Sequence, residues 1–291
     1  MKKIFFLILA ITICLTGCSS PERKAAGKLS VVASFYPMAE FARAVGGDKI
    51  DIVTLVPDGA EPHDWEPSPR DLTRLGRAKV FVYNGIVEPW ADTSLEALKE
   101  RKIFGVEAGR NLFLVNGKQD PHVWISPRKA MKEVQAICQA FSEVDAKNAA
   151  TYEKNAANYL SELQKLDTEL VKISQAAKRK SFVTSHRAFG HLAADYGLTQ
   201  ISISGISPES EPNPRDLKNL VNLVRKENVK YIFFETLASP KLAEMLAKET
   251  GAQSAVLDPI EGLDEEGKKA GVDYLKIQKE NVEALRKALC E

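Results

Sequence analysis

Residues 145–178 read DAKNAATYEKNAANYLSELQKLDTELVKISQAAK. The segment contains no Gly, no Pro and no β-rich run, so nothing in it interrupts a helix. Its apolar residues recur at alternating spacings of four and three, which places them on one face of a single helix about 50 Å long. This stripe consists of Tyr152, Ala156, Tyr159, Leu163, Leu166, Leu170, Ile173 and Ala177. A coiled-coil seam has the same spacing, but one such helix is better interpreted as a rigid connector.

Short β-rich runs alternate with amphipathic segments on both sides of this helix. We expect strands at residues 29–35, 49–56, 79–85, 112–115, 181–185, 199–206, 229–235 and 253–258. We expect helices at residues 37–45, 69–77, 127–141, 214–227 and 240–250. The alternation indicates an α/β fold with parallel sheets covered by helices on both faces. The chain exceeds the usual size of one core, which predicts two α/β domains, residues 29–144 and 180–291, joined by a linking helix at 145–179.

The two halves share an internal repeat. Residues 66–75 read EPSPRDLTRL, and residues 211–220 read EPNPRDLKNL. Each copy predicts a helix start, with Ser68 or Asn213 as the N-cap and a proline at the first helical position. Because the copies occupy matching places in the two halves, duplication explains them better than common capping chemistry alone.

The N-terminus has the pattern of an exported lipoprotein. Lys2 and Lys3 precede an apolar stretch, residues 4–15, that is shorter than the roughly 20 residues needed to cross a bilayer. It ends in Leu-Thr-Gly-Cys18, which resembles the bacterial lipobox and implies cleavage after residue 17 and lipidation of Cys18. Residues 1–17 are then a signal peptide, and residues 18–28 a tether to the extracytoplasmic side of the cell membrane. The alternative is a signal cut elsewhere, with Cys18 an ordinary thiol.

Charge and cysteine content exclude some functions and leave others open. The formal net charge is +1, and loss of the signal's lysines makes it slightly negative. Such a balance gives no electrostatic attraction for nucleic acid. Cys138 and Cys290 remain after Cys14 leaves with the signal and Cys18 is lipidated, and each lies near the end of a predicted helix. A disulfide between them and two unpaired thiols are both compatible with the sequence.

Three of the four histidines lie where an α/β fold binds ligands. His63 lies in the loop after the second expected strand, His122 follows the fourth, and His186 directly follows the fifth. Ligands bind outside the carboxyl ends of strands in such sheets, so these imidazoles are predicted to meet at one metal site. His191 lies five residues after His186, roughly 140° round a helix. We expect it to point away, as a surface or packing residue.

A carboxylate is expected to complete this site. Asp258 and Glu261 both follow the last expected strand, and either could join three imidazoles in a tetrahedral site. Both also fit ordinary turn chemistry, since Asp258 precedes Pro259 and Glu261 precedes Gly262. We expect one of them to ligate and the other to support the site or be solvated. Glu235 also ends a strand and is expected to have a supporting role.

Taken together, these features resemble a known family of metal receptors. The lipobox, the segments around His63, His122 and His186, the long helix and the Leu-Asp-Pro-Ile-Glu-Gly ending are similar to the zinc/manganese solute-binding lipoproteins of ABC importers, often called cluster A-I. The resemblance implies two (β/α)₄-type domains joined by a rigid helix, with the metal in the interdomain cleft. It also implies delivery to an ABC-transporter permease. Some relatives take their fourth ligand at the position of Asp258, and others at that of Glu261.

The ligand types favour Zn²⁺ as the metal. Three imidazoles and one carboxylate suit zinc, whereas manganese relatives tend to carry a carboxylate at the position of His186. We therefore expect a monomeric zinc receptor, with a manganese receptor as the alternative. Many zinc receptors carry a long histidine-rich insertion between the first two ligands, but residues 111–120 here are short and contain no histidine.

An exported zinc hydrolase is the competing class. The chain has neither His-Glu-x-x-His nor Gly-x-Ser-x-Gly. Glu61 and Asp64 flank His63, however, so a base beside a metal-bound water is available. A surface adhesin is a third class, for which nothing in the sequence argues directly. The prediction is a receptor and not an enzyme.

Overall fold

The computed structural model describes residues 27–208 and 213–291. The expected signal peptide at 1–17, the lipidation site Cys18 and most of the tether at 18–28 lie outside the described residues. So do Glu211 and Pro212 of the second repeat copy. In the part of the chain that is described, no helix is both long and apolar enough to cross a membrane.

The N-terminal half contains a four-stranded parallel sheet. Its strands are β1 (Leu29–Ala33), β2 (Ile50–Thr54), β3 (Val80–Tyr83) and β4 (Phe104–Glu107), in the order β2-β1-β3-β4. Every residue of the central strand β3 is buried, whereas in the edge strand β2 only Ile50 is buried and the following residues alternate between exposed and partly buried. This difference follows from position, because only inner strands are covered on both faces and along both edges.

The C-terminal half repeats this architecture. Its strands are β7 (Ser181–Thr184), β8 (Thr199–Ser202), β9 (Tyr231–Phe234) and β10 (Gln253–Val256), all parallel in the order β10-β9-β7-β8. In both halves the first strand lies between the second and the third, and the fourth lies at an edge. The shared order agrees with the sequence repeat and confirms the expected α/β class.

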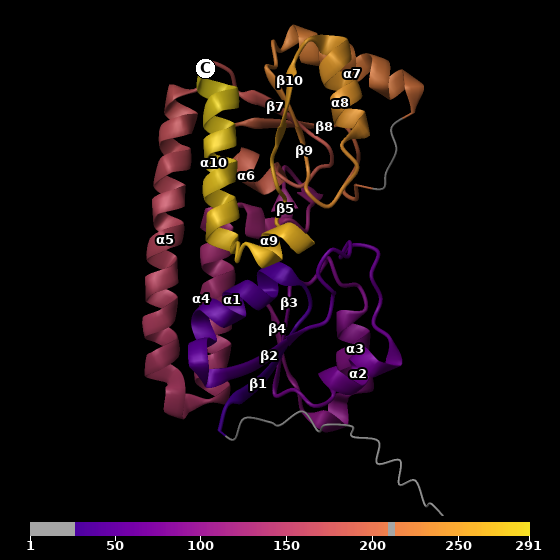
Figure 1. The fold of residues 1–291 in the computed structure, drawn as a ribbon. Helices are drawn as coiled ribbons and strands as arrows, with labels where there is room; N and C mark the ends of the chain where they lie inside the picture. The colour runs from indigo at the N-terminus through magenta and orange to yellow at the C-terminus, as the bar shows by residue number, and fades with distance from the viewer. Residues whose placement is uncertain (1–26, 209–212) are drawn as a thin grey trace, which may run out of the picture.

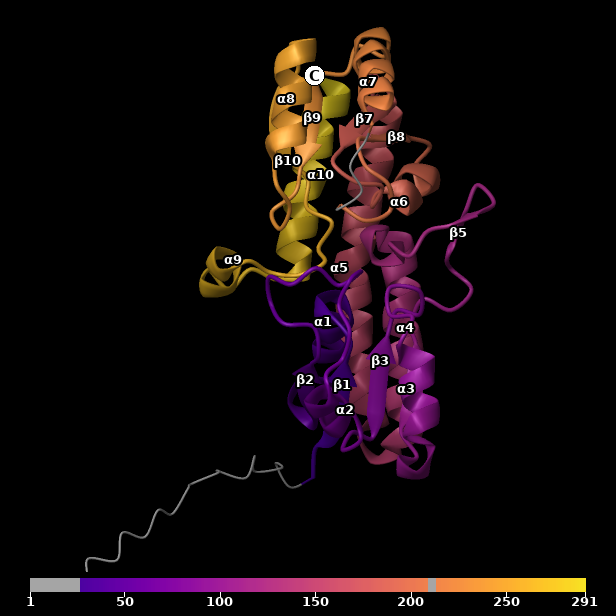
Figure 2. The ribbon, with the colours of Figure 1, turned by 90° about the vertical axis from the view of Figure 1, so that its right-hand side faces the viewer.

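Helices cover both faces of each sheet, as Figures 1 and 2 show. In the N-terminal half they are α1 (Tyr36–Gly46), α2 (Pro69–Leu75), α3 (Ala91–Ala97) and α4 (Pro127–Val144). In the C-terminal half they are α6 (Gly190–Asp195), α7 (Pro214–Lys226), α8 (Lys241–Thr250) and α10 (Tyr274–Cys290). The short α9 (Glu265–Lys269) lies apart from that sheet, beside the N-terminal half (Figure 2). The sequence did not predict α3, α6 or α9, which are short and carry little periodic signal.

The repeat forms equivalent helix starts in the two halves. Ser68 caps α2, with its hydroxyl accepting from Asp71 N at 3.4 Å, and the Asp71 carboxylate accepts in return from Ser68 N at 3.1 Å. Asn213 caps α7 by accepting from Asp216 N at 2.9 Å. Each helix follows the second strand of its sheet, which confirms the matching places of the two copies.

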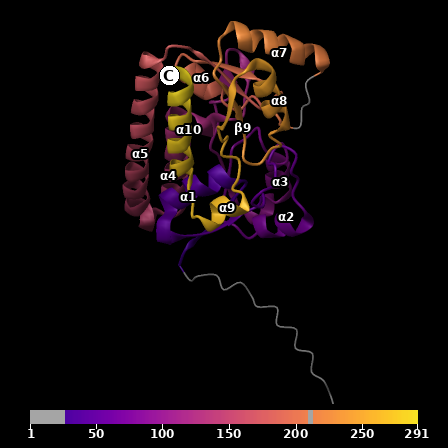
Figure 3. The same ribbon diagram turned by 45° about the horizontal axis from the view of Figure 1, so that its top comes forward.

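The long helix α5 (Ala149–Ala176) runs beside both halves (Figures 1 and 3). Its stripe packs on α4 and α1 of the N-terminal half and on α10 of the C-terminal half. The stripe residues Tyr152, Ala156, Leu163, Leu166, Leu170 and Ile173 are buried. The interpretation as a connector is therefore confirmed, because the apolar face is covered within one chain.

One expected strand of the N-terminal sheet is wrong. Residues 112–115 are not its fourth strand, which is β4. Part of that range forms a separate two-stranded hairpin of β5 (Leu114–Val115) and β6 (Lys118–Gln119). Asn116 and Gly117 connect them with positive φ values of 51° and 77°, which is the backbone of a tight hairpin turn. The Asn-Gly pair signalled that turn in the sequence.

Both cysteines of the folded part are free thiols. Cys138 is buried in α4, and Cys290, at the end of α10, lies with its Sγ 3.7 Å from Ile173 O. The structure therefore agrees with the unpaired alternative.

Candidate metal centre

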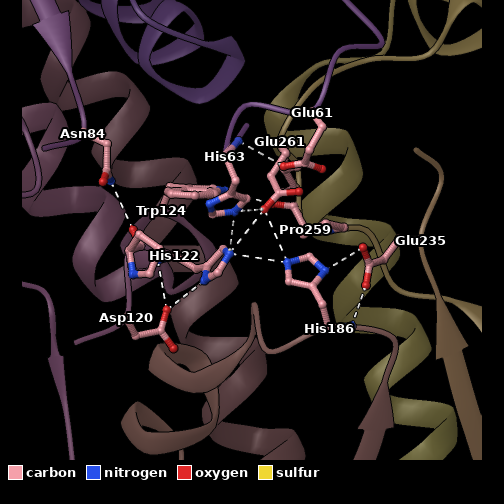
Figure 4. A network of polar contacts seen from close by, with 12 residues as sticks. Glu61, His63, Asn84, Asp120, His122, Trp124, His186, Glu235, Pro259 and Glu261 are labelled. Atoms are coloured by element: carbon pink, nitrogen blue, oxygen red, sulfur yellow. Dashed lines mark hydrogen bonds and ion pairs between the residues drawn. The ribbon is translucent and has the colours of Figure 1, made fainter. Parts of the chain in front are cut away.

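The carboxyl ends of the two sheets face each other, and four ligand-type side chains meet between them (Figures 1 and 4). His63 comes from the loop after β2, and His122 from the segment after β4 and the β5–β6 hairpin. His186 follows β7, and Glu261 follows β10. One nitrogen or oxygen atom of each lies within 4.8 Å of the others. We call His63, His122, His186 and Glu261 the four-residue group.

Five of the six distances between the facing atoms of this group are between 3.1 and 3.4 Å. His63 Nε2 lies 3.1 Å from His122 Nε2 and 3.1 Å from Glu261 Oε1. Glu261 Oε1 lies 3.3 Å from His122 Nε2 and 3.4 Å from His186 Nε2. His122 Nε2 and His186 Nε2 are 3.4 Å apart. Three imidazole nitrogens and one carboxylate oxygen thus surround a single point.

Two carboxylates orient the rings of the group from behind. Asp120 Oδ1 lies 2.8 Å from His122 Nδ1, and Glu235 Oε2 lies 2.7 Å from His186 Nδ1. Each carboxylate accepts the Nδ1 proton, so the Nε2 lone pair is directed at the centre. The supporting role expected of Glu235 is therefore observed. Sequence reasoning missed the role of Asp120, although its place two residues before His122 was a usable signal.

Burial and mutual attraction dominate the electrostatics of the group. The side chains of His122 and His186 are 0% exposed, Glu261 is 3% exposed and His63 is 9% exposed. Burial raises the pKa of Glu261, but the three histidines outweigh it and hold that pKa well below its usual range. Burial lowers the pKa of His186, but Glu261 and Glu235 outweigh it and raise the pKa to about 10.

The pKa of His122 is shifted in the same direction as that of His186. Burial lowers its pKa, but the carboxylates of Asp120 and Glu261 outweigh burial and raise it. A positive charge at the centre is thus stabilised, whether protons or a metal cation carry it. The donor atoms and their electrostatics therefore suit a cation at this point.

Asp258 lies outside the four-residue group. Its Oδ2 accepts from the Thr236 hydroxyl at 2.5 Å, and its Oδ1 accepts from Ile260 N at 2.7 Å. Both carboxylate oxygens are therefore used to shape the turn that leads to Glu261. Glu261, three residues later, is the carboxylate that reaches the centre.

His191 is also outside the group. It is fully buried in α6, and its Nε2 lies 2.8 Å from Asp120 O. Burial lowers the pKa of His191, so the ring is neutral and donates its Nε2 proton to that carbonyl. Of the two roles expected for His191, the structure therefore selects packing.

Glu61 and Asp64, which flank His63, differ in environment. Glu61 Oε1 accepts from His63 N at 3.1 Å, whereas Asp64 is exposed. Burial and the nearby Glu261 charge raise the pKa of Glu61 to about 7. The hydrogen bond from His63 N shows that Glu61 holds the backbone of the His63 loop.

Comparison with known proteins gives a consistent result over almost the entire chain. A family model described as zinc-uptake complex component A, periplasmic, matches residues 31–288. The chain is 37% identical to the high-affinity zinc uptake system protein ZnuA of Bacillus subtilis strain 168, over 98% of this chain and 96% of that protein.

A second relative is longer than this chain. The zinc-binding lipoprotein AdcA of Streptococcus pneumoniae R6 is 39% identical over 98% of this chain, which spans only 61% of AdcA. The crystal structure of the Zn(II)-bound ZnuA-like domain of S. pneumoniae AdcA superimposes with a TM-score of 0.82 at 42% identity. That match covers 91% of this chain and 100% of the domain.

Proposed function

The chain belongs to the zinc-uptake component A family of solute-binding receptors, and on that premise we propose that it captures Zn²⁺ outside the cytoplasm and delivers it to a membrane permease. The four-residue group is the proposed site, with His63, His122, His186 and Glu261 as ligands. Asp258 supports the turn before Glu261 and does not ligate.

The spacing of the four donor atoms carries this proposal. Zinc binds imidazole nitrogen and carboxylate oxygen at about 2.0–2.2 Å in tetrahedral geometry. The edges of such a tetrahedron are about 1.63 times the bond length, or about 3.3–3.6 Å. Five of the six distances between the donor atoms are 3.1–3.4 Å, close to that size, and the sixth, between His63 and His186, is within 4.8 Å, so an ion can be bound with small side-chain shifts.

The donor set favours zinc over manganese. Three imidazole nitrogens and one oxygen match a closed zinc site, whereas Mn²⁺ prefers harder oxygen ligands in larger number. His186 supplies the third nitrogen, and Glu235 keeps its Nε2 available to the metal. Relatives named as zinc-binding and zinc-uptake proteins support the same choice.

The group also favours a receptor over a hydrolase. Catalytic zinc keeps one position open for water, with a base beside it. Here four protein donors fill a tetrahedron, and Glu61 is hydrogen-bonded to the backbone of the His63 loop. The centre is therefore suited to holding a cation without a reaction.

Export, anchoring and domain division complete the proposal. Residues 1–17 act as a signal peptide, lipidated Cys18 attaches the chain to the membrane, and residues 18–28 form the tether. The name "zinc-binding lipoprotein" of a relative supports the anchor. A monomer with domains at 29–144 and 180–291, joined by the linking helix at 145–179, presents the metal to the permease.

A zinc titration of the purified chain with two matched carboxylate variants tests the proposal. The chain should bind one Zn²⁺, and Glu261→Gln should lower the affinity by about 100-fold, roughly one ligand's share of a zinc site. Asp258→Asn removes the same charge three residues away and should change affinity by less than tenfold. Equal losses of affinity in both variants, or an unchanged zinc affinity in Glu261→Gln, would falsify the ligand assignment. Steady hydrolysis of esters or peptides by the zinc-loaded chain would overturn the receptor function.

A further inference from the structure

The turn that carries Glu261 contains a strained residue. Ile260, directly before Glu261, has a φ of 57°. This left-handed conformation is a genuine outlier for a β-branched side chain, and it strains the backbone. Since strain of this kind persists only where the surroundings enforce it, the contacts that enforce it also determine where Glu261 points.

The first part of the turn is held by the C-terminal half itself. Asp258 N donates to Asn281 Oδ1 at 2.8 Å, and Asn281 Nδ2 donates to Asp258 O at 2.7 Å. The Asp258 side chain accepts from Ile260 N. Asn281 lies on α10 and is nearly fully buried, so this end of the turn is attached to a helix.

The second part of the turn is held from the other half of the molecule. Trp124 Nε1 donates to Pro259 O at 2.8 Å, across 135 residues of chain, as Figure 4 shows. Trp124 is 0% exposed, and its own carbonyl accepts from the Tyr274 hydroxyl at 2.5 Å. Its ring also lies 5.0 Å from that of Phe35 and 5.3 Å from that of His122.

We propose that Trp124 is a positioning residue for metal capture: its indole N–H fixes the Pro259 carbonyl, holds the left-handed turn at Ile260 and so aims the Glu261 carboxylate at the centre. The inference rests on the proposed function, because it presumes that Glu261 is a ligand. One hydrogen bond thus joins the loop of His122 to the loop of Glu261, so the donors from the two halves keep their spacing.

Removal of the indole N–H should have a specific consequence. The Pro259 carbonyl would be left buried without its donor, which favours rearrangement of the turn. Ile260 could then relax to an ordinary φ and displace Glu261, whereas metal–ligand distances tolerate only about 0.2 Å. Zinc affinity should therefore fall because Glu261 is displaced, and chiefly because zinc is released faster.

Trp124→Phe tests this, with Trp90→Phe as the matched control. The indole nitrogen of Trp90 is buried but has no hydrogen-bond partner among the described residues. Trp124→Phe should lower zinc affinity by about tenfold, as is typical when a group that orients a ligand is removed. Trp90→Phe should change it by less than about threefold. Equal effects of the two variants would contradict the proposal.

Double variants separate positioning from general destabilisation. In a Glu261→Gln background, Trp124→Phe should cause no further loss of affinity, because the ligand through which it acts is already removed. In a His63→Ala background, the full loss of about tenfold should persist. The same further loss in both backgrounds would show that Trp124 acts on the fold and not through Glu261.

A second variant covers the case in which Trp124→Phe does not fold. Asn281→Ala frees the Asp258 end of the same turn and should also weaken zinc binding only while Glu261 is present. If Glu261→Gln itself leaves zinc binding intact, the proposed function fails. If Glu261→Gln weakens binding while both turn variants bind like the unaltered chain, only the positioning role fails.

Discussion

The two halves of the molecule share one architecture but orient their histidines by different routes. Both sheets have the same strand order, and the helix after the second strand starts with the same capping chemistry. His122 is oriented by Asp120, two residues earlier in the same loop. His186 is oriented by Glu235, 49 residues later in sequence.

The reason lies in what surrounds each histidine. His186 follows β7, which pairs with β9, so the sheet register brings the end of β9 and Glu235 beside it. His122 lies in an irregular segment beyond a hairpin, outside the main sheet, and its orienting carboxylate comes from that same segment. The same chemical requirement is therefore met by sheet register in one half and by local sequence in the other.

The strongest test of this comparison removes one ligand from each half. His122→Ala and His186→Ala should each lower zinc affinity by about 100-fold or more, because each deletes one of four ligands. Competition with a zinc chelator measures the loss. If only one of the two substitutions weakens binding, the site does not span both halves.

A second test compares the two orienting carboxylates. Asp120→Asn and Glu235→Gln keep the shape of the side chain but remove its charge, and each should weaken zinc binding by about tenfold. Chelator competition at constant pH is the measurement, with the exposed Asp64→Asn as the control. If only Asp120→Asn lowers the zinc affinity, the carboxylate in the loop orients its histidine but the carboxylate at the strand end does not.

A third test counts protons. The pKa of His186 is raised to about 10, so this ring is protonated at pH 7 without metal, and the pKa of His122 is raised in the same direction. Zinc must displace the proton of His186, so its affinity should increase with pH until the pH passes about 10. Calorimetry in buffers of different ionisation enthalpy should give at least one proton released per zinc at pH 7. Release of no protons would be inconsistent with the raised pKa values.

The orienting carboxylates predict how that proton count changes. Glu235→Gln removes a charge that raises the pKa of His186, and Asp120→Asn does the same for His122. Each variant should release fewer protons per zinc than the unaltered chain. An unchanged number of released protons would show that these carboxylates do not raise the pKa values of the two histidines.

The smallest effect is expected at His191. Gln can still donate to the Asp120 carbonyl that His191 contacts, and the residue lies outside the four-residue group. His191→Gln should therefore change zinc affinity by less than about threefold, measured by the same competition. A loss as large as that of His186→Ala would require His191 to ligate.

Much of the fold and site was accessible from local sequence. The apolar stripe of α5 predicts a long helix, and the strands before His63 and His186 predict where these two residues lie. His122 was expected after a strand at 112–115, but it follows the β5–β6 hairpin, outside the main sheet. The fourth strand was missed because Phe104–Glu107 is short and contains Gly105, whereas residues 112–115 are more apolar. The role of Trp124 had no local signal, since its hydrogen-bond partner is 135 residues away.

The sequence by itself determined the alternation of strands and helices, the connector helix, and the places of His63 and His186 after strands of the two sheets. Periodicity, capping and order along the chain are local properties and can be recognised without coordinates. Only the tertiary structure shows that Glu261, and not Asp258, lies beside the three imidazoles, because both carboxylates follow the same strand. A left-handed Ile260, held by contacts from α10 and from Trp124, directs one of them into the centre, and no local preference of a β-branched residue predicts that conformation.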